Sequence, residues 1–154
     1  NEKEKAMTFC GTPEYLSPEV LLGKGHNRPT DWWTLGILIY EMVYGIPAFY
    51  DRNRKTMYQK IVKEPVVFRS SPPISDKCKD IITKLLEKDQ TKRLGSGNDS
   101  LEVLSHPWFA DIDLDLLTSR KLKPPFQPDL TNWEKNFDKD YMAEKKQLNN
   151  FLKK

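Results

Sequence analysis

The sequence predicts a mainly α-helical domain, and three observations lead to this fold class. Residues 30–44 are apolar on nearly every face of a helix, which is typical of a helix buried inside a soluble protein. Residues 75–87 follow the spacing of an amphipathic helix, through these apolar positions: Cys78, Ile81, Ile82, Leu85 and Leu86. No run of alternating apolar and polar residues indicates a strand, and no internal repeat occurs.

The first part of the chain is expected to form a loop that leads into the long helix. Glycines and prolines interrupt residues 1–29, apart from a short helical piece at residues 17–22. Thr30 or Asp31 can cap the long helix, because a short side-chain oxygen accepts an otherwise unpaired backbone N–H. Gly45 is then expected to end it. This helix should be the central rod of the domain, covered on all sides.

Three further elements follow the long helix. Residues 53–63 fit a short surface helix, and Ser75 is a suitable N-cap for the amphipathic helix after it. Residues 96–99 have the composition of a turn. A last short helix is expected at about residues 101–106.

Beyond Phe109 the sequence changes character. Three prolines break regular structure, and aromatic residues are spaced through polar sequence at these positions: Phe126, Trp133, Phe137 and Tyr141. Such a pattern favours an extended tail whose aromatic side chains anchor it to a folded surface. A disordered linker is the alternative.

Composition and charge exclude some classes of protein. Among 154 residues, 38% are hydrophobic and 11% aromatic, which is enough for a core. The net charge is only +3, and the last twelve residues, with four Lys and one Glu, account for all of it. A basic surface for nucleic acid is therefore excluded as the main interpretation.

The cysteines and apolar segments indicate an intracellular protein. Cys10 and Cys78 are too few for a disulfide framework, so we expect free thiols in a reducing compartment, the cytoplasm or alternatively the nucleus. Residues 35–44 form the longest apolar stretch, which Glu41 interrupts. This is far shorter than the roughly 20 residues of a membrane span, so no integral membrane segment is expected.

Two other features of the sequence limit its interpretation. His26 and His106 lie eighty positions apart without another ligand at a suitable spacing, which argues against a metal site. The chain begins at Asn1 in a polar stretch with no apolar face, so we expect a piece of a longer protein.

Six segments carry a more specific signal. In chain order they are residues 8–19 (TFCGTPEYLSPE), 31–36 (DWWTLG), 92–95 (KRLG), 106–109 (HPWF), 123–126 (KPPF) and 137–141 (FDKDY). The first resembles the end of the activation segment in protein kinases, and the second the start of their central buried helix. The next two resemble the closing motifs of the kinase domain. The last two resemble the C-terminal extension of the AGC group, which includes protein kinases A, B and C and the serum/glucocorticoid-regulated kinases.

This resemblance implies the lower part of the C-lobe of a bilobal α+β protein kinase. Residues 1–109 correspond to the C-terminal part of the kinase domain, and residues 110–154 to a partial AGC extension. The sequence contains no Gly-rich loop, strand Lys, catalytic-loop Asp or Asp-Phe-Gly motif, which kinases use to position the phosphates. These 154 residues alone are therefore expected to be inactive.

The parent protein is expected to be a serine/threonine kinase that uses ATP and Mg²⁺. The resemblance implies protein substrates with basic residues near the acceptor, an upstream activating kinase and the protein's own N-lobe as partners. A pseudokinase or a truncated, non-catalytic binding module is the alternative. The codons upstream of Asn1 distinguish them, because intact catalytic motifs there would support the enzyme.

The resemblance also assigns roles to residues of the activation segment. Thr8 corresponds to the phosphorylation site, and Thr12 to the residue whose hydroxyl supports the catalytic Asp. Two groups of substrate-binding residues follow: the apolar wall of Phe9, Pro13 and Leu16, and the acidic Glu14 and Glu41. An independent argument concerns Glu41, since an unpaired carboxylate on an otherwise buried helix is costly. We therefore expect it to have a partner.

Other residues are expected to support the architecture. Glu19 and Arg93 correspond to a buried ion pair of the family, although 74 positions separate them. Asp31 corresponds to the carboxylate that accepts N–H bonds from the catalytic loop, and Trp33 and Gly36 belong to the same helix motif.

The tail matches the AGC pattern only in part. Phe137 and Tyr141 correspond to aromatics that approach the nucleotide pocket. No Ser or Thr follows Thr131, and no Phe-x-x-Phe motif occurs. AGC tails often end with a turn-motif phosphorylation site and a Phe-x-x-Phe hydrophobic motif, so we expect either that the tail is cut short or that regulation through those sites is missing.

Overall fold

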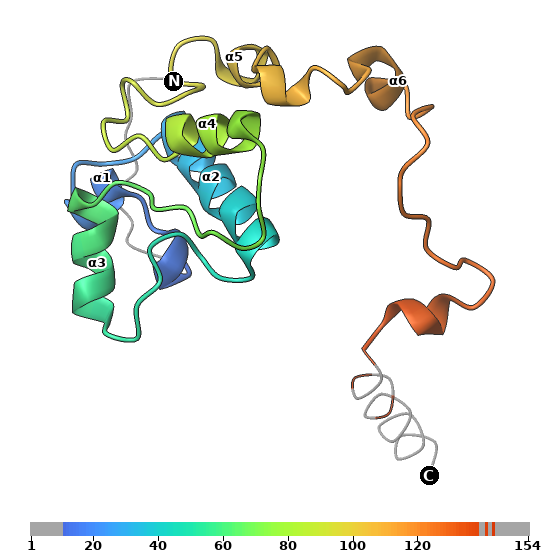
Figure 1. Cartoon of the computed structure of the whole chain (residues 1–154), viewed down its shortest axis with the longest axis horizontal. Helices are drawn as coiled ribbons and strands as arrows, with labels where there is room; N and C mark the ends of the chain where they lie inside the picture. Colours follow the sequence, from blue (N-terminus) through green and yellow to red (C-terminus); the bar gives the residue numbers. More distant parts are fainter. Residues whose placement is uncertain (1–10, 139–140, 142, 144–154) are drawn as a thin grey trace. The chain divides into compact units, whose positions relative to one another are not determined.

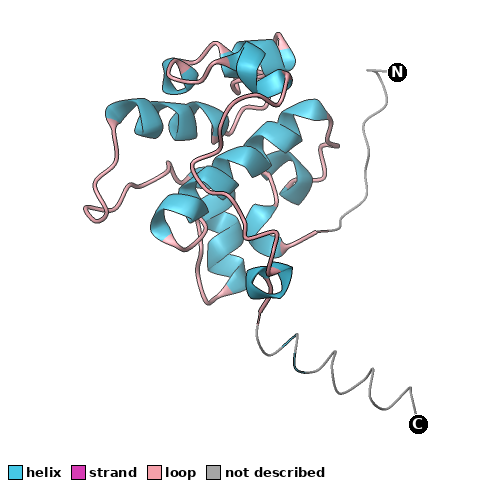
Figure 2. Cartoon of the chain, turned by 90° about the vertical axis from the view of Figure 1, so that its right-hand side faces the viewer, coloured by secondary structure: helices cyan, strands magenta, loops and turns pink. Residues whose placement is uncertain are grey.

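The computed structural model describes residues 11–138, 141 and 143, and their regular elements are helices joined by loops (Figure 1). In chain order the elements are η1 (Pro13–Tyr15), α1 (Pro18–Leu21), α2 (Arg28–Tyr44), α3 (Arg54–Lys63), α4 (Asp76–Leu85), α5 (Asp99–Leu104), η2 (Pro107–Phe109), α6 (Leu114–Thr118) and η3 (Trp133–Asn136). Figure 2 shows no β-strand among the described residues. The predicted mainly α-helical fold class is confirmed.

Helix α2 begins earlier than predicted. Its N-cap is Asn27, and Pro29 lies in its first turn, where the missing N–H of proline is not needed. The proposed caps Thr30 and Asp31 are therefore wrong, because both lie inside the helix. The predicted end is confirmed, since Gly45 is left-handed with φ 75° and its N–H donates to the Glu41 carbonyl over 2.7 Å.

One side of α2 forms the centre of the core. Trp33 and Ile37 have no exposed surface, and α2 packs against α4 (Figure 1). However, Leu38 is 42% and Met42 67% exposed. The prediction that α2 is covered on all sides is thus wrong for the described residues, because no described segment covers the face that carries Leu38 and Met42.

Gly36 allows α2 and α4 to approach each other closely. A Cβ atom at this position would lie 2.9 Å from Leu85 Cβ and from Leu86 Cδ2. Any larger residue would push the helices apart.

Helix α4 is amphipathic as predicted. Ser75 caps it by accepting the Cys78 N–H over 3.2 Å, and Ile81, Ile82 and Leu85 are fully buried. Burial of each such side chain contributes about 1.5–3 kcal/mol. The helix ends at Leu85, two residues before the predicted end.

Helix α3 lies where the sequence predicted it. Asn53 caps its start by accepting the Thr56 N–H over 3.2 Å, while Met57 and Ile61 bury its inner side. The helix packs against α1, whose position also agrees with the prediction.

Helix α5 begins and ends two residues before the predicted range. His106 consequently lies outside it and caps η2, where its Nδ1 accepts the Trp108 N–H over 3.1 Å. The Nε2 atom of the same ring lies 2.9 Å from an Asp80 carboxylate oxygen. Since Asp80 belongs to α4, this contact links η2 to α4.

The chain divides into two units, residues 1–112 and 113–154. The second unit contains the short helices α6 and η3. The part beyond Phe109 was expected to be extended, and the two helices show that it is so only in part. Phe126, Phe137 and Tyr141 are exposed by 73%, 48% and 56%. Their docking onto a folded surface stays a prediction.

Two other expectations concern membranes and thiols. No helix among the described residues is long and apolar enough to cross a bilayer. Cys78 is buried as a free thiol, whereas Cys10 lies outside the described residues.

Candidate functional site

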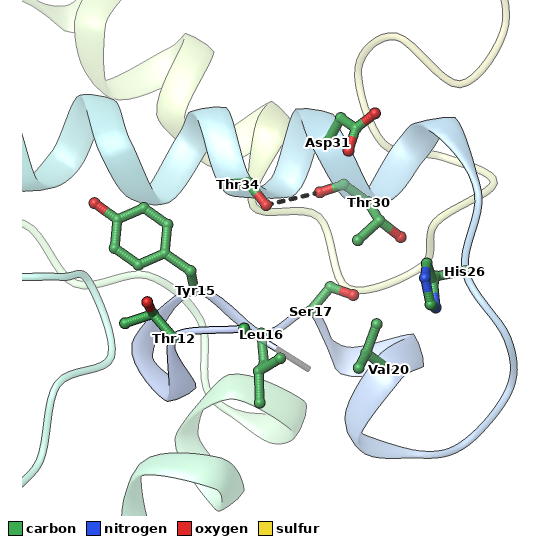
Figure 3. Close-up of a pocket in the computed structure, with 10 residues that line it drawn as sticks. Thr12, Tyr15, Leu16, Ser17, Val20, His26, Thr30, Asp31 and Thr34 are labelled. Carbon is green, nitrogen blue, oxygen red and sulfur yellow. Dashed lines mark hydrogen bonds between the residues drawn. The ribbon is translucent and has the colours of Figure 1, made fainter. Parts of the chain in front are cut away.

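A pocket of about 460 Å³ lies beside the first turns of α2. Figure 3 shows its two walls, one formed by η1 and α1 with the connection between them and the other by α2. The first wall contributes Thr12, Tyr15 and Ser17. The second contributes Thr30, Asp31 and Thr34. The structure thus brings Thr12 and Asp31, two residues predicted to adjoin a catalytic loop, to one cavity.

Thr12 and Asp31 both contribute to the lining of this pocket. Both are exposed, and neither side chain has a hydrogen-bond partner among the described residues. Thr12 is the N-cap of η1, yet its hydroxyl makes no capping bond. Its carbonyl accepts the Tyr15 N–H over 3.0 Å, which fixes the backbone of the turn.

Glu41 has the partner that its position on α2 requires. The Tyr15 hydroxyl donates a hydrogen bond to its carboxylate. This bond, together with burial and the carboxylate charge, raises the pKa of Tyr15 to about 12. Tyr15 therefore stays protonated and holds one oxygen of Glu41, and the half-buried carboxylate keeps an acceptor for another donor.

Sequence reasoning missed Tyr15. It lies 26 positions from Glu41, and no helical or strand periodicity connects the two. The only available signal was the argument that Glu41 needs a partner, which did not identify the donor.

The remaining predicted substrate-binding residues are placed differently. Pro13 and Glu14 lie in η1 and are half-buried. Leu16 is only 7% exposed and lines the pocket with that small surface. Thr8 and Phe9 lie outside the described residues.

Glu19 and Arg93 form a bidentate ion pair. Arg93 Nη1 lies 2.8 Å from Glu19 Oε1, and Nη2 lies 2.9 Å from Oε2. Both residues are at most 3% exposed. Burial alone would raise the pKa of Glu19, but the hydrogen bonds and charge of Arg93 lower it below its usual value. The pair therefore stays charged in the folded protein.

This ion pair belongs to a larger polar network that connects three segments. Arg93 also donates to the carbonyls of Pro29 and Glu87 over 2.7 and 2.9 Å. Thr30 donates its hydroxyl to Glu19 Oε1 over 2.9 Å. The network joins α1 and the start of α2 to the loop after α4.

Trp33 packs against cations and a second ring. It stacks on Phe49 with ring centres 5.7 Å apart, and Arg93 lies over its ring at 5.2 Å. Lys88 Nζ lies 3.7 Å from the centre of the Phe49 ring and donates to the Ile61 carbonyl over 2.8 Å. Burial and the nearby Arg93 charge lower the pKa of Lys88 to about 7.

Ser17 is a second residue that sequence reasoning did not identify. Its side chain is fully buried and lines the pocket, and its hydroxyl has no partner. Buried hydroxyl groups are usually paired. Its place in the SPE motif gave no sign of this.

Comparison with known proteins identifies the chain. The family model described as "Protein kinase domain" matches residues 1–109. The chain belongs to the protein kinase family. It is 46% identical over 145 residues to the serine/threonine protein kinase ypkA of Aspergillus fumigatus, covering 93% of this chain and 23% of the relative. It is 46% identical over 143 residues to the serine/threonine-protein kinase gad8 of Schizosaccharomyces pombe, covering 92% of this chain and 25% of the relative.

A vertebrate relative is nearly as similar to this kinase chain. Human serine/threonine-protein kinase Sgk1 is 44% identical over 139 residues, which are 89% of this chain and 32% of the relative. The resemblance to AGC-group kinases is thereby confirmed. The chain spans about a quarter to a third of the length of these relatives.

The described part of this kinase chain contains no group of three His, Cys, Asp or Glu side chains that could hold a metal ion. Kinases of this family use ATP and Mg²⁺. Asp31 lines the pocket without a second carboxylate beside it, so the described residues do not fit a Mg²⁺ site.

Proposed function

We propose that this chain belongs to an active serine/threonine protein kinase that phosphorylates protein substrates with basic residues near the acceptor. The observation that carries this proposal is the Tyr15–Glu41 contact. A carboxylate of α2 that is held by a tyrosine of residues 8–19 is a suitable acceptor for an arginine. A non-catalytic binding module has no evident need for this arrangement.

Substrate recognition is assigned to two kinds of residue. Glu41 and Glu14 would bind basic side chains through charge-assisted hydrogen bonds. The apolar wall of Phe9, Pro13 and Leu16 would receive the residue after the acceptor. Because Leu16 is nearly buried, we expect Phe9 and Pro13 to supply most of this wall.

Thr12 and Asp31 are assigned to the support of the catalytic loop. Both line one pocket, and neither side chain has a hydrogen-bond partner among the described residues. The hydroxyl of Thr12 would hold the catalytic Asp where the substrate hydroxyl arrives. The Asp31 carboxylate would accept backbone N–H groups of the same loop. The main residues that hold ATP and Mg²⁺ in the intact kinase would lie in the parent protein, outside these 154 residues.

The substrate proposal is tested by steady-state kinetics on the protein expressed from its full gene. With an Arg-containing peptide, Glu41→Gln should raise KM about tenfold or more, because a charged hydrogen bond contributes roughly 1.5–3 kcal/mol. Tyr15→Phe should raise KM less, since the carboxylate remains but loses its orientation. Glu64→Gln, an exposed residue after α3, is the matched control. Equal KM values for Glu41→Gln and the control would refute the assignment.

A second test concerns activation. A phosphate on Thr8 adds roughly −1.5 to −2 charges and can order the loop against arginines. An upstream kinase would supply it. Thr8→Ala should therefore abolish most activity toward the peptide, and equal activity of this variant and the wild type would disprove the switch.

A further inference from the structure

A groove of about 510 Å³ is lined by the end of α1 and by α3, and it shares no lining residue with the pocket at α2. Leu21, at the end of α1, forms its floor together with Tyr58 and Val62 of α3. These three side chains are half-buried, so each keeps an apolar surface open to the groove.

The rim of this α3 groove is basic. Arg54 and Lys55 lie at one end and Lys63 at the other, and all three are exposed. None of them forms an ion pair with a described residue. In contrast, Lys60 on the same helix is neutralised by Asp51 at 2.9 Å and does not line the groove. No acidic side chain lines it either.

We propose that the α3 groove binds an acidic peptide segment of a partner protein, with an apolar side chain between two acidic ones. The charges at the ends attract carboxylates, and the floor of Leu21, Tyr58 and Val62 receives the apolar side chain. Nucleic acid would satisfy the cations but would leave this apolar floor without a matching group.

The spacing of the cations sets the spacing of the acidic residues. Lys55 and Lys63 both line the groove and are eight residues apart on α3, so they lie on nearly the same side of the helix and about 12 Å apart along it. An extended peptide covers that distance with about four residues. Carboxylates four positions apart, with an apolar residue between them, therefore match the groove.

Fluorescence polarisation tests this proposal on the protein expressed from its full gene. The probe is the fluorescein-labelled peptide Glu-Glu-Leu-Glu-Phe-Glu-Glu. In one control peptide both apolar residues are replaced by Ser, and in another all Glu are replaced by Lys. We expect measurable binding of the probe alone, and binding that weakens as NaCl rises from about 50 to 500 mM, because salt screens surface charges.

Two matched variants locate the binding site. Lys55 and Lys77 are both exposed and are the second residues of α3 and α4, so replacing either by Glu changes the net charge equally. Lys55→Glu should weaken probe binding about tenfold, since attraction becomes repulsion. Lys77→Glu should change it less than about twofold.

Three results would overturn the proposal. They are an equal loss of affinity in both variants, equal affinity for the Ser-substituted peptide, and displacement of the probe by oligodeoxythymidine at a lower concentration than by unlabelled probe. Binding does not depend on phosphoryl transfer. An inactive but folded protein should thus bind the probe as tightly as an active one. A failure of the groove proposal can therefore be distinguished from a failure of the proposed kinase activity.

Discussion

Replacing Glu19 by Gln should destabilise this protein more than any change to a surface ion pair. Arg93 donates four hydrogen bonds, two of them to the Glu19 carboxylate and two to backbone carbonyls. The substitution Glu19→Gln removes the opposing charge and turns an amide N–H₂ group toward the guanidinium. Because Arg93 has no exposed surface, water cannot replace the lost partner. Breaking a buried pair in this way costs about 3–5 kcal/mol.

Urea unfolding followed by circular dichroism measures this cost. With a slope of about 2 kcal/mol per molar urea, the midpoint should fall by about 2 M. The matched control is Lys79→Gln, which breaks an ion pair to Asp76 whose side chains are 43% and 99% exposed. That variant should lose less than about 1 kcal/mol.

The double variant Glu19→Leu/Arg93→Met provides a further check. It should be more stable than Glu19→Leu alone, since no buried charge is left unpaired. The pKa of Glu19 is lowered in the folded protein, so its contribution to stability should be lost as the pH falls through the acidic range. A Glu19→Gln midpoint equal to that of Lys79→Gln would refute this reasoning.

Two other predictions follow from the core. Burial, together with the Arg93 charge, lowers the pKa of Lys88 from 10.5 to about 7, so between these values the unfolded chain binds more protons and the free energy of unfolding should rise with pH. Lys88→Met should flatten this rise in urea titrations at several pH values, and an unchanged slope would contradict the assignment. Gly36→Ala would place a Cβ 2.9 Å from Leu85 Cβ and should cost about 1–3 kcal/mol in the same urea assay. A more stable variant would show that α2 and α4 can move apart without loss.

Much of the fold was accessible from local sequence. The apolar spacing of α4 and its Ser75 cap predicted that helix, and Gly45 predicted the end of α2. These signals are local, because capping and amphipathicity involve residues a few positions apart. The start of α2 was missed although Asn27 and Pro29 carried a local signal, since Thr30 and Asp31 offered equally good caps.

The candidate site could be predicted from sequence motifs only in part, because its contacts join segments that are distant along the chain. The motifs around Thr12 and Glu19 predicted the family, and the comparisons confirmed it. They did not predict that Tyr15 holds Glu41 or that the Ser17 hydroxyl is buried without a partner. Those facts depend on how the turn before α1 lies against α2.

By itself, then, the sequence predicted α1 to α5 to within a few residues, the Ser75 cap of α4, the Gly45 end of α2 and the protein kinase family of this chain. Only the tertiary structure decided which face of α2 is buried, which donor pairs with Glu41 and where basic side chains border an apolar groove on α3. The physical reason is distance along the chain. A helix is specified by neighbours three or four residues apart, whereas these contacts join residues 26 or more positions apart, or surfaces of two helices, through the packing of the whole core.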